Sequence, residues 1–251
     1  MAWECADQTQ EGVKHRQFLT AEWRHLAMLN YVADASLLKP QVPMGTELDF
    51  YEGKSFVSIV GFNFLNTKVF GCAIPFHRNF EEVNLRFYVR RKGPEGWRRG
   101  VVFIRELVPR RAIALIARTF YGEPYTALPM RHSIEENPNG VRVEYAWKRD
   151  EEWESISVFA EQPREIRSAS LEEFITEHYW GYTSQTAGCS EYQVEHPRWK
   201  VGRAKEATLN ANIPSLYGDA FLDILSAQPA SAFRADGSPV LVRRAAELKT
   251  F

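Results

Sequence analysis

Residues 83–90 alternate strictly between two kinds of side chain, and this pattern limits the possible folds more than any other part of the sequence. The run reads Val-Asn-Leu-Arg-Phe-Tyr-Val-Arg. Because successive side chains of a strand point to opposite faces of the sheet, a period of two predicts a β-strand with one apolar and one polar face. A Gly-Pro-Glu-Gly turn at 93–96 follows, so the apolar segment 100–107 is expected to return beside it as the second strand of a hairpin.

Further strands are predicted on both sides of this hairpin. Segment 55–64 is apolar on both faces, as in a buried central strand, and segment 47–51 is expected to pair with it across a turn at 52–53. The Asn-Pro-Asn-Gly sequence at 137–140 is a strong hairpin signal. It predicts a run of antiparallel strands at about 128–135, 141–149 and 153–161.

Helices are predicted at three places. Segment 111–121 is rich in alanine and leucine, segment 170–179 opens with a capping box, and segment 215–225 follows a proline. A short helical turn is expected at 34–38, whereas the periodicity of 23–32 does not decide between helix and strand. Many antiparallel strands with a few helices indicate a β-rich α+β fold, built on a curved, cone- or barrel-like antiparallel sheet.

The chain is expected to form one domain behind a tail. Residues 1–17 are polar and mixed in charge, which predicts a flexible N-terminal tail, and no linker or repeat divides residues 18–251. No apolar run resembles a secretory signal or a membrane span, so we expect a cytoplasmic protein without a membrane partner. The three cysteines are far apart and form no CxxC pair, which argues against a disulfide framework and a zinc site.

Positive charge is concentrated around the hairpin. The net charge of the chain is −1, yet residues 86–118 contain ten Lys/Arg and only two acidic residues. A basic patch of this kind, Arg90–Arg111, can bind nucleic acid. We favour the simpler interpretation that it is a solvated hairpin tip, because charged runs are usually solvent-facing. On that interpretation four arginines are exposed: Arg90, Arg91, Arg98 and Arg99.

The polar face of the alternating strand is the first candidate site. Period two places Glu82, Asn84 and Arg86 about 7 Å apart along one face. There Arg86 could clamp a carboxylate or phosphate, Asn84 could add a hydrogen bond, and Glu82 could transfer protons. The alternative is a solvent-facing surface with cross-strand ion pairs. We find no nucleotide-binding or nucleophile motif and no histidine pair at metal-ligand spacing, so neither a cofactor nor a metal is predicted.

Two adjacent charges, Arg105 and Glu106, lie on opposite faces of the returning strand. One of them is expected to face inward, where a charge needs a partner such as Glu82 or Arg86. Which of the two does so stays open, and the strand end could also have reached solvent. Arg105 is taken as a candidate ligand-binding residue.

Several motifs in order resemble the YqjF-like family of uncharacterised proteins, within the acetoacetate decarboxylase-like superfamily. They are the segments 19–24, 37–43, 80–89, 100–103, 117–125 and 194–199. The resemblance implies a β-rich, cone- or barrel-like body with an enclosed pocket. It further implies that 23–32 is largely a strand and that Glu82 corresponds to a pocket glutamate.

Segment 117–125 determines which chemistry the resemblance implies. Decarboxylases of the superfamily present a Schiff-base lysine in the motif Gly-Arg-Glu-x-Trp-Gly-Phe-Pro-Lys. This chain matches at Arg118, Gly122 and Pro124, but Tyr125 stands in place of the lysine, and residues 93–147 contain no lysine. A phenol cannot form an imine. Tyr125 is therefore predicted to be an acid–base group, and Arg118 an anion-binding residue. Only Lys54 and Lys68 could supply an amine from elsewhere.

Three functions remain open at this point. The first is altered chemistry on a small carbonyl or carboxylate compound, with Glu82 and Tyr125 catalytic and four residues binding the ligand: Asn84, Arg86, Arg105 and Arg118. The second is a non-catalytic ligand sensor with the same pocket. The third and least favoured is nucleic-acid binding through the basic patch. The expected partner is a small anionic or carbonyl ligand, and the chain could form a homo-oligomer.

Overall fold

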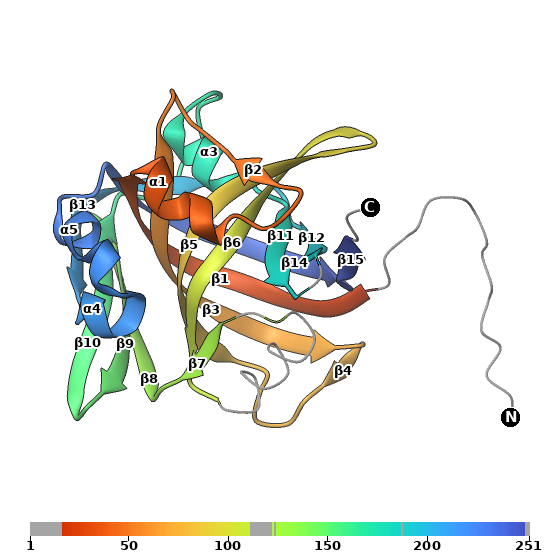
Figure 1. Ribbon diagram of the computed structural model, residues 1–251. Helices are drawn as coiled ribbons and strands as arrows, with labels where there is room; N and C mark the ends of the chain where they lie inside the picture. The colour runs from red at the N-terminus through yellow and green to blue at the C-terminus, as the bar shows by residue number, and fades with distance from the viewer. Residues whose placement is uncertain (1–16, 111–121, 123, 187, 249–251) are drawn as a thin grey trace, which may run out of the picture.

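The computed structural model describes residues 17–110, 122, 124–186 and 188–248 (Figure 1). The strands are β1 (Gln17–Ala33), β2 (Glu47–Leu48), β3 (Ser55–Val69), β4 (Cys72–Ala73), β5 (Phe80–Gly93), β6 (Gly96–Val108), β7 (Tyr125–Ala127), β8 (Met130–Asn137), β9 (Gly140–Arg149), β10 (Glu152–Ala160), β11 (Trp180–Gln185), β12 (Gly188–Glu195), β13 (Val201–Asn210), β14 (Ser231–Arg243) and β15 (Ala246–Leu248). The helices are α1 (Ala35–Leu38), α3 (Leu171–Thr176), α4 (Ile213–Tyr217) and α5 (Leu222–Ser226), with 3-10 turns η1 (Lys39–Gln41) and η2 (Asp219–Phe221).

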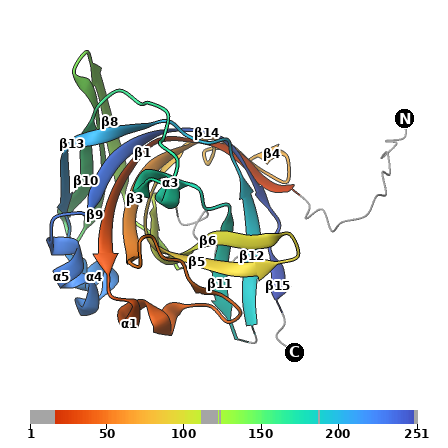
Figure 2. The ribbon, with the colours of Figure 1, turned by 90° about the horizontal axis from the view of Figure 1, so that it is seen from above.

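The strands form one large sheet whose middle part closes on itself. The order β12-β11-β6-β5-β3-β1-β14 is completed by a second pairing of β14 with β12, at Val194–Val242 and Glu195–Leu241. The result is a ring of seven strands. Viewed from above, the sheet curves round an interior, and α3 lies over the near opening (Figure 2). Strands β13, β10, β9 and β8 continue from β14 as an extension of the same sheet.

The β-rich α+β fold with a curved sheet is confirmed, with one correction. The sheet is mixed and not purely antiparallel, because β7 and β11 both run parallel to β6. A second correction concerns segment 47–51. Its strand β2 pairs with β5, through Glu47–Arg90 and Leu48–Val89, and not with β3. Segment 23–32 lies within β1, as the resemblance implied.

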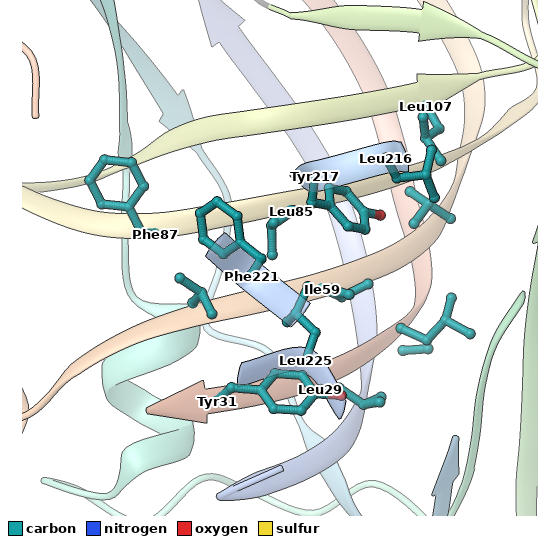
Figure 3. Close-up of a cluster of buried hydrophobic side chains, with 14 of the residues drawn as sticks. Leu29, Tyr31, Ile59, Leu85, Phe87, Leu107, Leu216, Tyr217, Phe221 and Leu225 are labelled. Atoms are coloured by element: carbon teal, nitrogen blue, oxygen red, sulfur yellow. The ribbon is translucent and has the colours of Figure 1, made fainter. Parts of the chain in front are cut away.

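The alternation in β5 separates two hydrophobic regions. Leu85 and Phe87 point away from the ring into a cluster that helices α4 and α5 cover, and the labelled side chains of this cluster come from both layers (Figure 3). Burying an aliphatic or aromatic side chain of this size contributes about 1.5–3 kcal/mol. Tyr88 belongs to a second cluster, on the inner face of the ring. The apolar face of β5 therefore holds the outer layer in place, and its other face is left to line the interior.

The predicted helices differ in their outcome. Helix α3 begins where the capping box predicts, since Ser170 Oγ accepts a hydrogen bond from the Glu173 amide at 3.2 Å. The single helix predicted at 215–225 is wrong: α4 and α5 are separate, with Gly218 between them at φ +95°. Segment 111–121 lies outside the described residues. So does the predicted tail except for Gln17, and the single domain at 18–251 stays a prediction.

The arginines of the β5–β6 hairpin are not exposed as predicted. All four are partly buried and form ion pairs with carboxylates. Glu191, whose side chain is only 3% exposed, binds two of them at once. The pairs are Arg90–Glu47 at 2.7 Å, Arg91–Glu191 at 3.3 Å, Arg98–Glu191 at 2.5 Å and Arg99–Asp49 at 2.7 Å. Nearby carboxylates therefore neutralise most of the positive charge of these four arginines.

Within the part of the chain that the structure describes, no helix is both long enough and apolar enough to cross a membrane.

Candidate functional site

A cavity of about 160 Å³ lies inside the ring of strands. Its walls are mainly aromatic and aliphatic, with Trp23 from β1, Phe62 and Phe64 from β3, and Phe103 from β6 among them. Strand β5 brings three polar groups into this apolar space, namely Glu82, Asn84 and Arg86. A mostly apolar cavity with a few convergent polar groups is typical of a small-molecule site.

Glu82 accepts two hydrogen bonds at this polar side. Asn84 Nδ2 donates to Oε1 at 2.9 Å, and Tyr125 Oη donates to Oε2 at 3.1 Å. The Glu82 side chain is almost completely buried. Burial raises the pKa of Glu82 to about 7, although these two hydrogen bonds and the charge of Arg86 act in the opposite direction. The carboxyl group can therefore exist in either protonation state near neutral pH.

Arg86 brings a positive charge into the same cavity. Its Cζ lies 5.8 Å from the centre of the Tyr88 ring, and its buried Nε has no hydrogen-bond partner among the described residues. A buried donor without an acceptor is costly, and a guanidinium matches the shape of a carboxylate. The position of Arg86 therefore suits the binding of an anion.

A β-bulge in β6 decides which of Arg105 and Glu106 faces inward. Leu85 is opposite Arg105, but Arg86 is opposite Phe103, so Ile104 is an extra residue on β6. The bulge reverses the alternation after Phe103, and Glu106 lines the cavity, 1% exposed.

Arg105 is consequently not among the residues that line the cavity, which corrects its placement in the ligand site. It lies on the outer face, where Nη1 donates to Thr126 Oγ1 at 3.2 Å. Strict alternation from Val101 and Phe103 would have placed Arg105 inside.

The structure brings together four of the six residues predicted for the site. Glu82, Asn84, Arg86 and Tyr125 line one cavity, and Tyr125 is held there because β7 pairs with β6 at Glu106. Arg118 lies outside the described residues. The catalytic and binding roles of these residues stay predictions.

Neither of the two lysines considered as substitutes for the missing amine lines the cavity. Lys54 and Lys68 are exposed, and none of the described residues that line the cavity is a lysine.

Sequence reasoning missed a second polar group in the cavity, formed by His178 and its neighbours. His178 lies between α3 and β11, packs against Tyr88 with ring centres 4.6 Å apart, and lines the cavity. Its Nε2 is 3.4 Å from Asp49 Oδ2, and Asp49 also binds Arg99. Burial lowers the pKa of His178 to about 4, against the opposing effect of Asp49. No spacing in the sequence indicates this cluster, because its members come from three distant segments.

The solved structures that this chain resembles define the class of fold. One is an acetoacetate decarboxylase-like enzyme from Sphingomonas wittichii RW1, with a TM-score of 0.67, 13% identity, and coverage of 94% of this chain and 95% of that chain. Another is acetoacetate decarboxylase from Legionella pneumophila, with a TM-score of 0.61, 12% identity, and coverage of 97% and 92%. A third is the enduracididine biosynthesis enzyme MppR complexed with pyruvate, with a TM-score of 0.63, 12% identity, and coverage of 94% and 91%. The fold is therefore that of the acetoacetate decarboxylase-like enzymes.

Within this class, the chain belongs to the DUF2071 family of uncharacterized conserved proteins, whose profile matches residues 20–239. It is 30% identical over 195 residues to the uncharacterized protein YqjF of Bacillus subtilis. The aligned region covers 76% of this chain and 77% of that relative. The resemblance seen in the sequence motifs is thereby confirmed.

Proposed function

We propose that the cavity binds a small carboxylate that also carries a carbonyl group, and that Glu82 and Tyr125 act on it as an acid–base pair without a Schiff base. One observation carries the proposal: the Arg86 guanidinium shares the cavity with a carboxyl group whose pKa is near neutrality. Arg86 would hold the carboxylate, and the carbonyl would lie toward Glu82 and Tyr125.

The supported chemistry is proton transfer at the carbon next to the carbonyl. Ionised Glu82 removes that proton, the C–H electron pair forms the enolate, and the Tyr125 hydroxyl donates a hydrogen bond to the oxygen that becomes negative. The reverse step returns the proton from Glu82 to carbon. Asn84 keeps the Glu82 carboxylate oriented through the 2.9 Å hydrogen bond.

Two further observations support this assignment. The described lining residues include no amine, so a route through an imine has no nucleophile among them. Of the structures with the same fold, MppR is complexed with pyruvate, a carboxylate with an adjacent carbonyl. That ligand belongs to MppR, and it illustrates the size and chemistry that such a fold accommodates.

Binding is tested by titrating the purified protein with pyruvate and with 4-oxopentanoate in a calorimeter. We expect Arg86→Gln to weaken binding of the better ligand by about 10- to 100-fold, because a hydrogen bond to a charged group contributes about 1.5–3 kcal/mol. Arg105→Gln is the matched control, because it removes the same charge from the outer face and should leave the affinity unchanged. Equal losses in the two variants would refute the proposed site.

Catalysis is tested separately by following exchange of the protons beside the carbonyl into deuterated water by NMR. Wild-type protein should accelerate the exchange, and Glu82→Gln should abolish the acceleration while ligand binding persists. Binding without any acceleration would instead identify the protein as a non-catalytic ligand sensor.

A further inference from the structure

The inner face of β5 presents its polar groups in a fixed order. Glu82, Asn84, Arg86 and Tyr88 occupy successive inward positions, about 7 Å apart along the strand. His178 packs on Tyr88, so it lies beyond Arg86 on the side away from Glu82. A ligand carboxylate on Arg86 would therefore have Glu82 and Tyr125 on one side and the imidazole on the other.

The surroundings of His178 determine what its ring offers to a ligand. Nε2 faces the carboxylate of Asp49 at 3.4 Å, and an acceptor at this place favours the tautomer with the proton on Nε2. Although burial raises the pKa of Asp49, its contacts with His178 and Arg99 lower it overall, so Asp49 remains an anion. At 3.4 Å the contact of Nε2 with Asp49 is an ion-pair contact, and both ring nitrogens are buried without a hydrogen-bond partner among the described residues. Nδ1 is the nitrogen that this contact leaves as an acceptor.

An unpartnered Nδ1 lone pair requires a donor. The side chain of His178 is 1% exposed, so bulk water does not satisfy it. A second carboxylate oxygen would be repelled, whereas a hydroxyl group would donate. Phe174 packs edge-on against the ring at 5.2 Å, which together with Tyr88 holds the imidazole in this orientation.

We propose that the cavity selects acids that carry a hydroxyl group beside the carboxylate and a carbonyl farther along, and that His178 Nδ1 accepts the hydrogen bond from that hydroxyl. The proposal rests on the proposed function, since it requires the carboxylate to lie on Arg86. His178 is then a specificity-determining residue and Asp49 the residue that positions it. In the bound ligand, the hydroxyl would lie at His178, the carboxylate at Arg86, and the carbonyl toward Glu82 and Tyr125.

A matched pair of ligands tests this selection on the full chain. We would measure the affinities of 2-hydroxy-4-oxopentanoate and 4-oxopentanoate, which differ only in the hydroxyl group. Wild-type protein should prefer the hydroxy acid by about three- to tenfold, the range of one additional hydrogen bond. In His178→Phe the preference should fall to about one, while the affinity for 4-oxopentanoate is kept. His196→Phe is the matched control, because that imidazole stacks on Trp199 and does not line the cavity.

A second variant guards against misfolding of the first. His178→Leu removes both ring nitrogens with a smaller side chain, so it should also abolish the preference. Equal wild-type affinities for the two ligands, or a preference that survives in both variants, would overturn the inference and leave the proposed function standing. If neither ligand bound to wild-type protein, the proposed function would fail and the selectivity with it.

Discussion

Glu82 links the stability of the fold to pH, because its burial opposes its charge. Its pKa is about 7 in the folded protein against an ordinary value of 4.5, so the folded state holds a proton that the unfolded state releases between these values. The contribution of Glu82 to stability is therefore fully present below about pH 4.5 and is lost as the pH rises through 7. Each unit of pKa corresponds to about 1.4 kcal/mol.

Glu82→Gln should remove this dependence. Between about pH 4.5 and pH 8, the wild-type free energy of unfolding should fall by a few kcal/mol because of Glu82. The variant should not show this loss, since glutamine has no charge to desolvate. Urea unfolding at the two pH values measures the difference. The same difference between variant and wild type at both pH values would mean that Glu82 is ionised in the folded protein throughout.

Tyr125 leads to a prediction about covalent chemistry. Wild-type protein treated with pyruvate and borohydride should show no mass increase, because a phenol forms no imine and the described cavity wall contains no lysine. Mass spectrometry of the intact protein detects an adduct. Because Lys54 and Lys68 are exposed, an adduct mapped to either would show that an amine reaches the ligand by a route that this structure does not contain.

Sequence reasoning succeeded at residues whose signal is local. Glu82, Asn84 and Arg86 belong to one uninterrupted alternation, so their common face could be predicted from the strand alone. Arg105 could not be placed, because an extra residue at position 104 reverses the alternation and only the pairing with β5 reveals it. His178 was missed because its polar neighbours are distant in the chain.

At the scale of elements, Gly61 shows how β3 connects the ring to the extension of the sheet. A Cβ at this position would be 2.6 Å from Cδ2 of Tyr145 in β9 and 3.1 Å from Cγ2 of Ile156 in β10. The close approach of these strands therefore depends on the absence of a side chain in β3. The apolar pattern of residues 55–64 predicts a buried central strand, but it contains no signal for this contact.

Gly61→Ala should destabilise the protein by about 1–3 kcal/mol, the usual cost of overpacking a core. Chemical denaturation measures the loss, and ligand affinity should be retained because position 61 faces away from the cavity. An unchanged free energy of unfolding would indicate that β9 moves aside at no cost.

At the scale of the whole molecule, closure of the ring was not predictable from the chain. The curved sheet followed from the number of strands and from the resemblance. The closing pair of β12 with β14 consists of two residue pairs, supported by an ion pair between Arg243 and Glu195 at 2.6 Å. Neither strand has a sequence signal that specifies this partner, because pairing of distant strands depends on the tertiary arrangement.

Charge compensation over the molecule leads to a prediction about nucleic acids. The hairpin arginines are already paired with Glu47, Asp49 and Glu191, so few counterions would be released on binding a phosphate backbone. We expect no tight binding of DNA or RNA at about 150 mM salt in a filter-binding assay. Tight binding with a steep salt dependence, lost when Arg91 and Arg98 are neutralised, would show that the nucleic acid displaces these carboxylates.

The two faces of β5 also affect how such a chain can change over time. Odd-numbered side chains such as Leu85 and Phe87 secure the outer layer, whereas Glu82, Asn84 and Arg86 line the cavity. Substitutions at these three positions therefore change the chemistry of the cavity without touching the outer layer. A mutant library restricted to positions 82, 84 and 86 would vary the chemistry of the cavity while the outer layer keeps its packing.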